Sequence, residues 1–177
     1  MLSYQWQGVS LIRIPHKVIF DVDGVLTDGS FYSSIEGKLL KKFGPHDHDG
    51  IKMIAPFFDI LFVTADKRGF EISRKRIVSE MNQKLLLINE KNRLKILAQD
   101  HSLDRSAYMG DGFYDAPILQ YAQLGIAPSN ARIEAQRAAD YVTPSMGGNG
   151  AVLDACLYLL ERYYPIKLAE ILESECV

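Results

Sequence analysis

Two carboxylates, Asp21 and Asp23, follow a short apolar run in residues 18–24 (VIFDVDG). The apolar β-formers predict a buried strand, and side chains two positions apart on a strand project to the same side. Such a pair is costly unless a cation lies between the carboxylates or one of them keeps its proton. Gly24 and Gly29 allow the backbone to turn tightly where a ligand approaches. The segment therefore predicts half of a Mg²⁺ and phosphate site at the end of a strand.

The two acids suit different chemical roles. Asp21 is the candidate nucleophile, because a carboxylate that attacks phosphorus forms an aspartyl-phosphate and divides one difficult displacement into two easier ones. Asp23 is placed to protonate the leaving oxygen and afterwards to deprotonate the attacking water. The competing interpretation is a pair of turn-forming or capping aspartates.

A second pair of acids, Asp111 and Asp115, lies in residues 110–115 (GDGFYD), where a strand is expected to end and a helix to begin. Hard carboxylate oxygens and few protein ligands suit Mg²⁺, which keeps several waters. We expect Asp111 to be a metal ligand, together with Asp21 and Asp23, so that the ion neutralises phosphate charge. Asp115 is either a further residue of the metal site or an acid favoured by a helix dipole.

Thr64 and Lys91 complete the predicted catalytic set. A hydroxyl at the end of the expected strand 59–64 and an ammonium group at a helix start are both able to bind oxygens of a transferring phosphoryl group. A lysine at a helix N-terminus is electrostatically unfavourable, which favours a functional role for Lys91 over a solvated surface position. Lys95 competes for this role one helical turn further on.

Short apolar runs alternate with helical patterns along the chain, which predicts an α/β fold with a mostly parallel sheet covered on both faces. In such sheets ligands bind beyond the carboxyl ends of the strands, and the polar candidates follow predicted strands. Beyond the first run, strands are expected at residues 59–64, 85–88, 107–109, 124–127 and 141–143. Helices are expected at 50–58, 69–81, 91–100, 115–123, 131–139 and 151–163, and from Pro165 onward.

Length and composition predict one domain over residues 1–177, because 177 residues suffice for a sizeable core. A net charge of −2 gives no indication of nucleic-acid or membrane binding. The two cysteines, Cys156 and Cys176, do not suggest a disulfide framework and favour a reducing compartment. No signal peptide and no apolar run of the roughly 20 residues needed for a membrane span is evident, so we expect a cytoplasmic protein.

Residues 21–29 (DVDGVLTDG) resemble the first motif of the haloacid dehalogenase superfamily of phosphotransferases. More narrowly, they resemble its compact sugar-acid phosphatase branch, which acts on 3-deoxy-D-manno-octulosonate 8-phosphate and acylneuraminate 9-phosphates. Residues 125–131, 139–143 and 147–152 also resemble this branch, so the likeness covers about residues 17–162. It implies a three-layer Rossmann-like fold without a large cap domain and Mg²⁺ as the cofactor. The implied substrate carries the terminal phosphate of a 3-deoxy-2-ulosonic sugar acid.

The resemblance also implies roles for single residues. It gives Asp21 the nucleophilic role and Asp23 the acid–base role, with the backbone carbonyl of Asp23 also reaching the metal. It assigns Asp111 to the metal and Asp115 to support nearby. Thr64 and Lys91 match the two remaining superfamily positions, where a hydroxyl and an ammonium group are expected to bind oxygens of the transferring phosphoryl group.

The chain departs from the branch at three motifs. The usual Thr-Gly-Arg is here TADKR at 64–68, which puts an acid at the arginine position and displaces the arginine to Arg68, a candidate substrate contact. Gly-Asp-Asp becomes GDG at 110–112, and Arg-Asp-Gly becomes GPHDHDG at 44–50. The alternating acids and histidines of 46–49 are a metal tract or, more simply, a polar loop near the pocket, with Asp47 as a candidate substrate contact. These departures bear on substrate identity rather than on the phosphoryl chemistry.

A β-hairpin is expected across residues 30–43, with a turn at Glu36 and Gly37. In relatives this hairpin joins those of three other subunits, and its apolar residues here favour a homotetramer over packing on its own core. The tail from Pro165 to Val177 is expected to be an amphipathic packing helix. Two alternatives to the sugar-acid phosphatase stay open: a phosphatase for another small phosphosugar or a nucleotide, and a non-catalytic tetramerisation domain.

Overall fold

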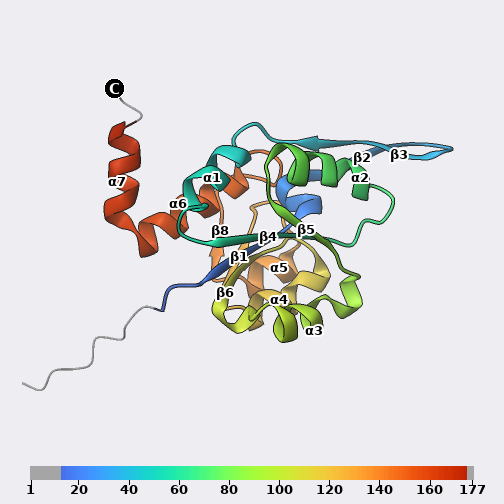
Figure 1. Ribbon diagram of the computed structural model, residues 1–177. Coiled ribbons are helices and arrows are strands. Elements are labelled where there is room, and N and C mark those ends of the chain that lie inside the picture. Colours follow the sequence, from blue (N-terminus) through green and yellow to red (C-terminus); the bar gives the residue numbers. More distant parts are fainter. Residues whose placement is uncertain (1–12, 175–177) are drawn as a thin grey trace, which may run out of the picture.

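The computed structural model describes residues 13–174, so the expectations for the N-terminal segment and for Cys176 fall outside it. A six-stranded sheet in the order β5-β4-β1-β6-β7-β8, with every pairing parallel, forms the centre of the molecule (Figure 1). Its strands are β1 (Lys17–Asp21), β4 (Asp59–Thr64), β5 (Lys84–Leu87), β6 (Ser106–Met109), β7 (Leu124–Ala127) and β8 (Tyr141–Val142).

Helices cover both faces of this sheet, as the alternating pattern predicted. The side chains of Val18 and Phe20 on β1 pack in one apolar cluster, and Ile19 packs in the other. The first face carries α1 (Asp47–Ile54), α2 (Phe70–Arg74), η2 (Lys75–Glu80) and α6 (Ala151–Tyr163) (Figure 1). The second carries α3 (Glu90–Asp100), η3 (Leu103–Arg105), α4 (Ala116–Tyr121) and α5 (Ile133–Ala138). The expected three-layer α/β fold is therefore confirmed.

The strand order determines where a site can form. After β1 the chain builds β4 and β5 on one side, and it then crosses to build β6, β7 and β8 on the other. Adjacent parallel strands that lead away in opposite directions leave a crevice at their carboxyl ends. Asp21 pairs with Val63 of β4, and Phe20 pairs with Met109 of β6. The residues that follow these three strands consequently meet at one edge of the sheet.

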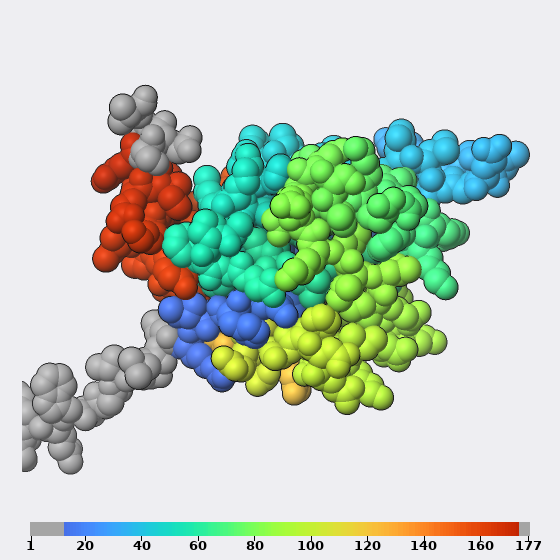
Figure 2. All heavy atoms as spheres, viewed as in Figure 1, coloured from blue at the N-terminus to red at the C-terminus, as the bar shows by residue number. Residues whose placement is uncertain are grey.

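The predicted hairpin is present and stands apart from the main sheet. It consists of β2 (Thr27–Ser34) and β3 (Gly37–Phe43), paired antiparallel. In Figure 2 it projects from the body of the molecule at the end opposite α7 (Pro165–Ser174). A short irregular turn, η1 (Val22–Leu26), links it to β1.

The first predicted helix differs from the observed one at both ends. The helix expected at 50–58 instead begins at Asp47 and ends at Ile54, because the acids of its first turn are favoured at a helix N-terminus and Pro56 cannot continue it. The stretch 46–49 is therefore mostly the start of a helix rather than a loop.

Cys156 is buried with a free thiol. Within residues 13–174, no helix has both the length and the apolar character needed to cross a membrane.

Candidate active site

Asp21 ends the central strand and is 6% exposed. Its Oδ1 accepts a hydrogen bond of 2.9 Å from Nη1 of Arg93, a residue of α3 that is itself 4% exposed. Burial raises the pKa of Asp21 well above its usual range, the Arg93 guanidinium opposes that shift, and the neighbouring Asp115 and Asp111 add to it. The site thus contains more negative charge than its one buried arginine compensates.

Arg93 also binds Asp115. This contact connects α3, which follows β5, with the turn that follows β6. Nη1 of Arg93 lies 3.1 Å from Oδ1 of Asp115, and the Tyr108 hydroxyl donates to the same oxygen at 2.6 Å. The other oxygen of Asp115 accepts from the backbone N–H of Gly112 at 2.9 Å. Burial alone would lower the pKa of Arg93, but Asp21, Tyr108 and Asp115 raise it, so the guanidinium stays charged. Both oxygens of Asp115 are therefore occupied by protein donors, and its position is that of a support.

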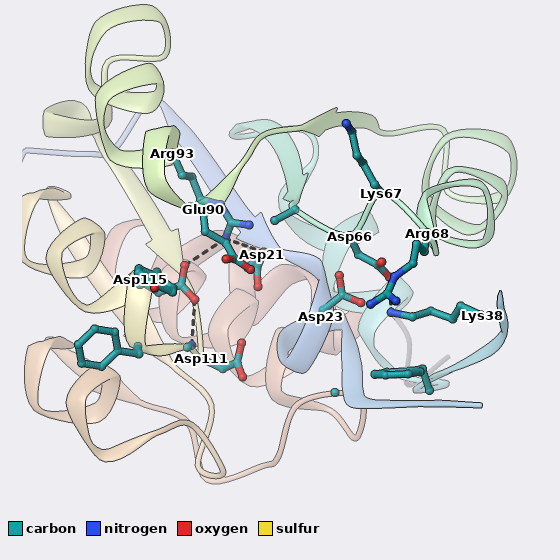
Figure 3. Close-up of a pocket in the computed structure, with 16 residues that line it drawn as sticks. Asp21, Asp23, Lys38, Asp66, Lys67, Arg68, Glu90, Arg93, Asp111 and Asp115 are labelled. Carbon is teal, nitrogen blue, oxygen red and sulfur yellow. Dashed lines mark hydrogen bonds and ion pairs between the residues drawn. The ribbon is translucent and has the colours of Figure 1, made fainter. Parts of the chain in front are cut away.

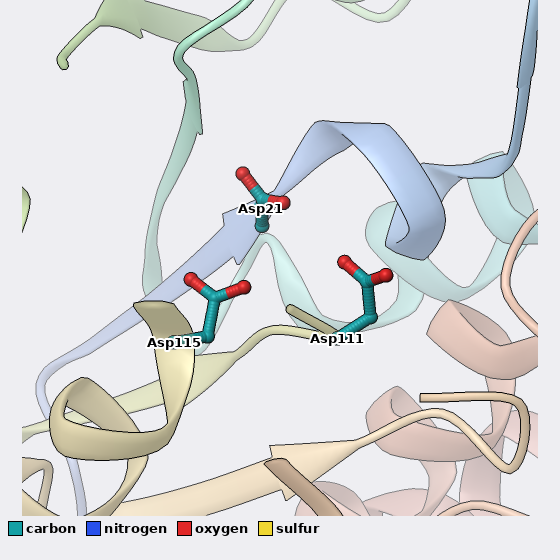
Figure 4. Close-up of side chains that lie close together, drawn as sticks. All are labelled: Asp21, Asp111 and Asp115. Carbon is teal, nitrogen blue, oxygen red and sulfur yellow. The ribbon is translucent and has the colours of Figure 1, made fainter. Parts of the chain in front are cut away.

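Asp111 differs from Asp115 in having a free carboxylate. Among the described residues no side chain donates to it or pairs with it, and burial together with Asp115 and Asp23 raises its pKa to about 7. One carboxylate oxygen from each of Asp21, Asp111 and Asp115 lies within 4.8 Å of the others (Figure 4). A set of hard oxygen ligands with uncompensated charge fits Mg²⁺. Asp21 and Asp111 are the residues here that would hold such an ion.

Asp23 is half-buried, and both of its carboxylate oxygens are held. The Thr64 hydroxyl, at the end of β4, donates to Oδ2 of Asp23 at 2.8 Å. The ammonium group of Lys41, on hairpin strand β3, lies 2.6 Å from Oδ1. Thr64 is fully buried, and it supports Asp23 rather than facing the open pocket.

The backbone around Asp23 depends on two glycines. Gly24 has φ +93°, and a Cβ placed there would lie 2.2 Å from Oδ2 of Asp111. A Cβ on Gly147 would lie 1.9 Å from the carbonyl oxygen of Gly24, and the Gly148 N–H donates to the Val25 carbonyl. The glycine-rich stretch before α6 consequently packs directly on the turn that carries Asp23.

A pocket of about 480 Å³ opens at this edge of the sheet (Figure 3). Aromatic side chains of Phe31, Phe113 and Tyr114 form part of its wall. Its charged lining consists of the acids Asp21, Asp23, Asp66, Glu90, Asp111 and Asp115 and the cations Lys38, Lys67, Arg68 and Arg93. The predicted residues Asp21, Asp23, Asp111, Asp115 and Arg68 are thus brought together.

Besides Thr64, two further predicted residues do not line this pocket. The Lys91 side chain is exposed and does not line the pocket, although its backbone N–H is capped by Asn89. Asp47 is 1% exposed, and its surroundings at the start of α6 include the backbone N–H groups of Val152 and Leu153. Burial raises the pKa of Asp47, and those N–H groups oppose the shift.

Sequence reasoning missed Arg93 and Lys41. A signal for Arg93 was available: on a helix that begins at Glu90, residue 93 lies on a different face from Lys91, and Leu94 and Leu97 mark the face toward the core. No comparable signal existed for Lys41, because its role depends on the tertiary position of the hairpin. It is the ion-pair partner of Asp66, the acid at the position where the branch usually has arginine.

An α/β fold with a buried carboxylate at the end of the central strand, a free carboxylate on the neighbouring loop and a buried cation fits the class of metal-assisted phosphotransfer enzymes. Residues 60–155, more than half of the chain, match the haloacid dehalogenase-like hydrolase family. The chain belongs to this family.

The relatives fit the expected phosphatase branch. The 3-deoxy-D-manno-octulosonate 8-phosphate phosphatase KdsC of Escherichia coli (strain K12) is 30% identical over 150 residues, covering 81% of this chain and 78% of that protein. The protein of the same name from Haemophilus influenzae is 32% identical over 139 residues, covering 76% of each.

Solved structures give the same result. A probable YrbI family phosphatase from Pseudomonas syringae superposes with a TM-score of 0.78 at 28% identity, over 91% of this chain and 93% of that one. The cobalt-bound form of the deoxy-D-mannose-octulosonate 8-phosphate phosphatase from Haemophilus influenzae gives 0.73 at 28% identity, over 84% and 88%. The expected family and branch are confirmed.

Proposed function

We propose that this protein is a Mg²⁺-dependent phosphomonoesterase that releases the terminal phosphate of a 3-deoxy-2-ulosonic sugar acid. The observation that carries the proposal is the placement of Asp21: a buried carboxylate at the end of the central strand, held by Arg93 and facing the free carboxylate of Asp111. The names of the relatives, which share about 30% of their residues with this chain, support the substrate class.

In the first half of the reaction the Asp21 carboxylate attacks phosphorus, and the bond from phosphorus to the sugar oxygen breaks. Asp23 donates its proton to that departing oxygen, which therefore leaves as a neutral hydroxyl group of the sugar acid. In the second half Asp23 removes a proton from water as the water attacks the aspartyl-phosphate. The P–O bond to Asp21 then breaks, which releases phosphate and regenerates both carboxylic groups in their starting forms.

Arg93 and a bound metal ion would stabilise the negative charge of Asp21 and of the phosphate during these steps. The guanidinium of Arg93 favours the ionised form of Asp21 against the effect of burial, and it lines the pocket where phosphoryl oxygens would arrive. Mg²⁺, held by Asp21, Asp111 and the backbone carbonyl of Asp23, would neutralise the phosphate charge and align it with the nucleophile. The cobalt ion in the Haemophilus influenzae structure supports a divalent metal at this kind of site.

The decisive experiment is phosphate release from 3-deoxy-D-manno-octulosonate 8-phosphate in the presence of Mg²⁺, with Asp21→Asn as the matched control. We expect rapid release by the wild type and none by the variant. Release from other phosphosugars but not from this substrate would instead favour the second candidate, a phosphatase for another small phosphosugar. The observation behind that candidate is Asp66, an acid within the pocket at the position usually occupied by arginine.

We infer that the protein is cytoplasmic and consists of a single domain over residues 1–177. We also infer that it forms a homotetramer through the hairpin. Five apolar side chains of the hairpin are more than half exposed: Phe31, Tyr32, Ile35, Leu39 and Leu40. A two-stranded hairpin with this much exposed apolar surface is marginal by itself and typical of an interface. Phe31 also lines the pocket, so partner hairpins would lie next to the substrate.

A purely structural tetramerisation domain is disfavoured, because it has no need for the buried acids around Asp21.

A further inference from the structure

A buried network connects the hairpin to the acid–base residue. The Lys41 ammonium group, whose side chain is 1% exposed, contacts three partners: Oδ1 of Asp23 at 2.6 Å, Oδ2 of Asp66 at 2.9 Å and the Ser73 hydroxyl at 2.9 Å. A buried ammonium without partners is very unfavourable. Lys41 therefore stays in place only while the carboxylates around it stay in place.

Asp66 is the centre of this network. Its Oδ2 also binds Lys38 at 2.5 Å, its Oδ1 accepts from the Gly69 N–H, and its backbone N–H donates to the Thr64 hydroxyl at 3.0 Å. Burial alone would raise the pKa of Asp66, but Lys38 and Lys41 hold it far below its usual range. Asp66 thus remains an anion between two hairpin lysines.

The two contacts that hold Asp23 both depend on Asp66. The Thr64 hydroxyl donates to one oxygen of Asp23 while accepting from the backbone of Asp66, and Lys41 binds the other oxygen while paired with the Asp66 carboxylate. An arginine at position 66 would face two lysines and would remove the second of these links. The acid at 66 and the lysine at 41 therefore function as a pair.

We propose that Asp66 and Lys41 are positioning residues that fix the Asp23 carboxylate in the direction of the leaving oxygen. Neither touches the phosphoryl group in this role; both act through Asp23. The proposal rests on the proposed function and assigns a role to the acid that replaces the usual arginine. It also means that the hairpin supplies part of the machinery for leaving-group departure.

The test compares two substrates that differ in how much proton donation they need. The alkyl ester 3-deoxy-D-manno-octulosonate 8-phosphate has a poor leaving group, whereas 4-nitrophenyl phosphate has a good one. The value of kcat/KM reports on the step in which the leaving group departs. Asp66→Asn keeps a side chain able to accept from Gly69, and Lys41→Met keeps the length of the side chain. Lys42→Met is the control, because Lys42 is an exposed neighbour that pairs with Asp28.

We expect Asp66→Asn and Lys41→Met to lower kcat/KM for the alkyl ester about 100-fold, in the range of general acid catalysis, and that for the aryl ester less than about 3-fold. Lys42→Met should leave both values unchanged. An equal loss with both substrates would show a merely structural role for the network and overturn the proposal. An absence of loss with either substrate would overturn it too.

A second measurement does not depend on turnover. In the protein labelled with ¹⁵N-lysine, we expect a slowly exchanging ammonium signal from Lys41 at neutral pH, assigned by its absence in Lys41→Met. The signal should disappear in Asp66→Asn and Asp23→Asn and persist in Lys42→Met. A signal that persists in Asp66→Asn would refute the positioning role. Failure of the wild type to hydrolyse either ester would refute the proposed function, while this measurement would still decide whether Asp66 holds Lys41 against Asp23.

Discussion

Nη1 of Arg93 and Oδ1 of Asp21 lie 2.9 Å apart across 72 residues of sequence, in a site where both side chains are more than nine-tenths buried. The same nitrogen also donates to Oδ1 of Asp115. One guanidinium thus connects the end of the central strand with the loop after β6. A guanidinium stays charged when buried, whereas the pKa of a buried ammonium group shifts readily, so arginine suits this shared position better than lysine.

The first prediction separates Arg93 from Lys91. Arg93→Lys keeps the charge but loses the shared contact, and we expect it to lower kcat/KM at least about 10-fold. Arg93→Met should lower it by about 100-fold or more, the scale of one lost electrostatic contact to a transition state. Lys91→Met should change it less than about 2-fold. Steady-state phosphate release measures all three.

Stability data must accompany these rates, because removal of one partner from a buried ion pair costs about 3–5 kcal/mol. Thermal unfolding of each variant identifies any loss of folded protein. The reverse pattern, an inactive Lys91→Met and an active Arg93→Lys, would restore Lys91 to the catalytic set.

The second prediction concerns Asp111 and pH. Burial and Asp115 raise its pKa in the folded protein to about 7, so the folded chain retains a proton that the unfolded chain releases near pH 4. The corresponding stability is present below pH 4 and is lost as the pH rises through 7. At pH 8 without metal, Asp111→Asn should therefore be more stable than the wild type, on the order of 2 kcal/mol after allowance for screening.

The same variant tests the metal site. Added Mg²⁺ should raise the unfolding temperature of the wild type at pH 8, and it should raise that of Asp111→Asn much less, because binding to the folded state alone is stabilising. Calorimetry in EDTA and in Mg²⁺ gives both comparisons. An equal Mg²⁺ response in the two proteins would remove Asp111 from the metal site.

The third prediction concerns the hairpin interface. Light scattering after size exclusion should give the wild type a mass near four times the 19.9 kDa of the chain. Leu40→Lys places a charge in the exposed apolar patch and should produce smaller species. Glu36→Lys changes the charge at the polar turn and serves as the control. A wild type that elutes as a monomer at micromolar concentration would contradict the tetramer.

The fourth prediction concerns Gly147. Its φ is not in the left-handed region, so Gly147→Ala acts only through the added Cβ, which would lie 1.9 Å from the Gly24 carbonyl oxygen. Since backbone must move, we expect a loss of about 1–3 kcal/mol in the free energy of unfolding, together with lower kcat. At Gly37 the added Cβ would meet open space, but φ is +132°, so Gly37→Ala acts only through backbone strain. It should destabilise the hairpin turn without lowering kcat to the same extent.

The alternation of apolar runs and helical patterns was enough to predict the α/β layers, because a buried parallel strand has a local signature in hydrophobicity. The positions of Asp21, Asp23 and Asp111 followed from the same logic, since each comes directly after a predicted strand. The start of α1 was misplaced by three residues because the polar stretch 46–49 suggested a loop.

The cations were harder to predict than the acids. Arg93 and Lys91 are two residues apart on one helix. Arg93 is buried at the site and Lys91 is exposed because of how α3 is rotated about its axis. Lys41 lies on a strand whose partner contacts come from residues 18 and 25 positions away, Asp23 and Asp66. Ion pairs between distant elements have no pattern in a single sequence, so only the structure reveals them.

The strand order has a consequence for how the chain is synthesised. β1 emerges from the ribosome first, but its two neighbours in the sheet are β4 and β6, the latter from residue 106 onward. Until β6 exists, one edge of an apolar strand stays unpaired, and such an edge is a template for aggregation. Nascent chains that stall before residue 106 should accordingly require chaperone protection, whereas chains released after α6 should not. Asp21, at the end of β1, is thus synthesised early and reaches its buried position in the sheet late.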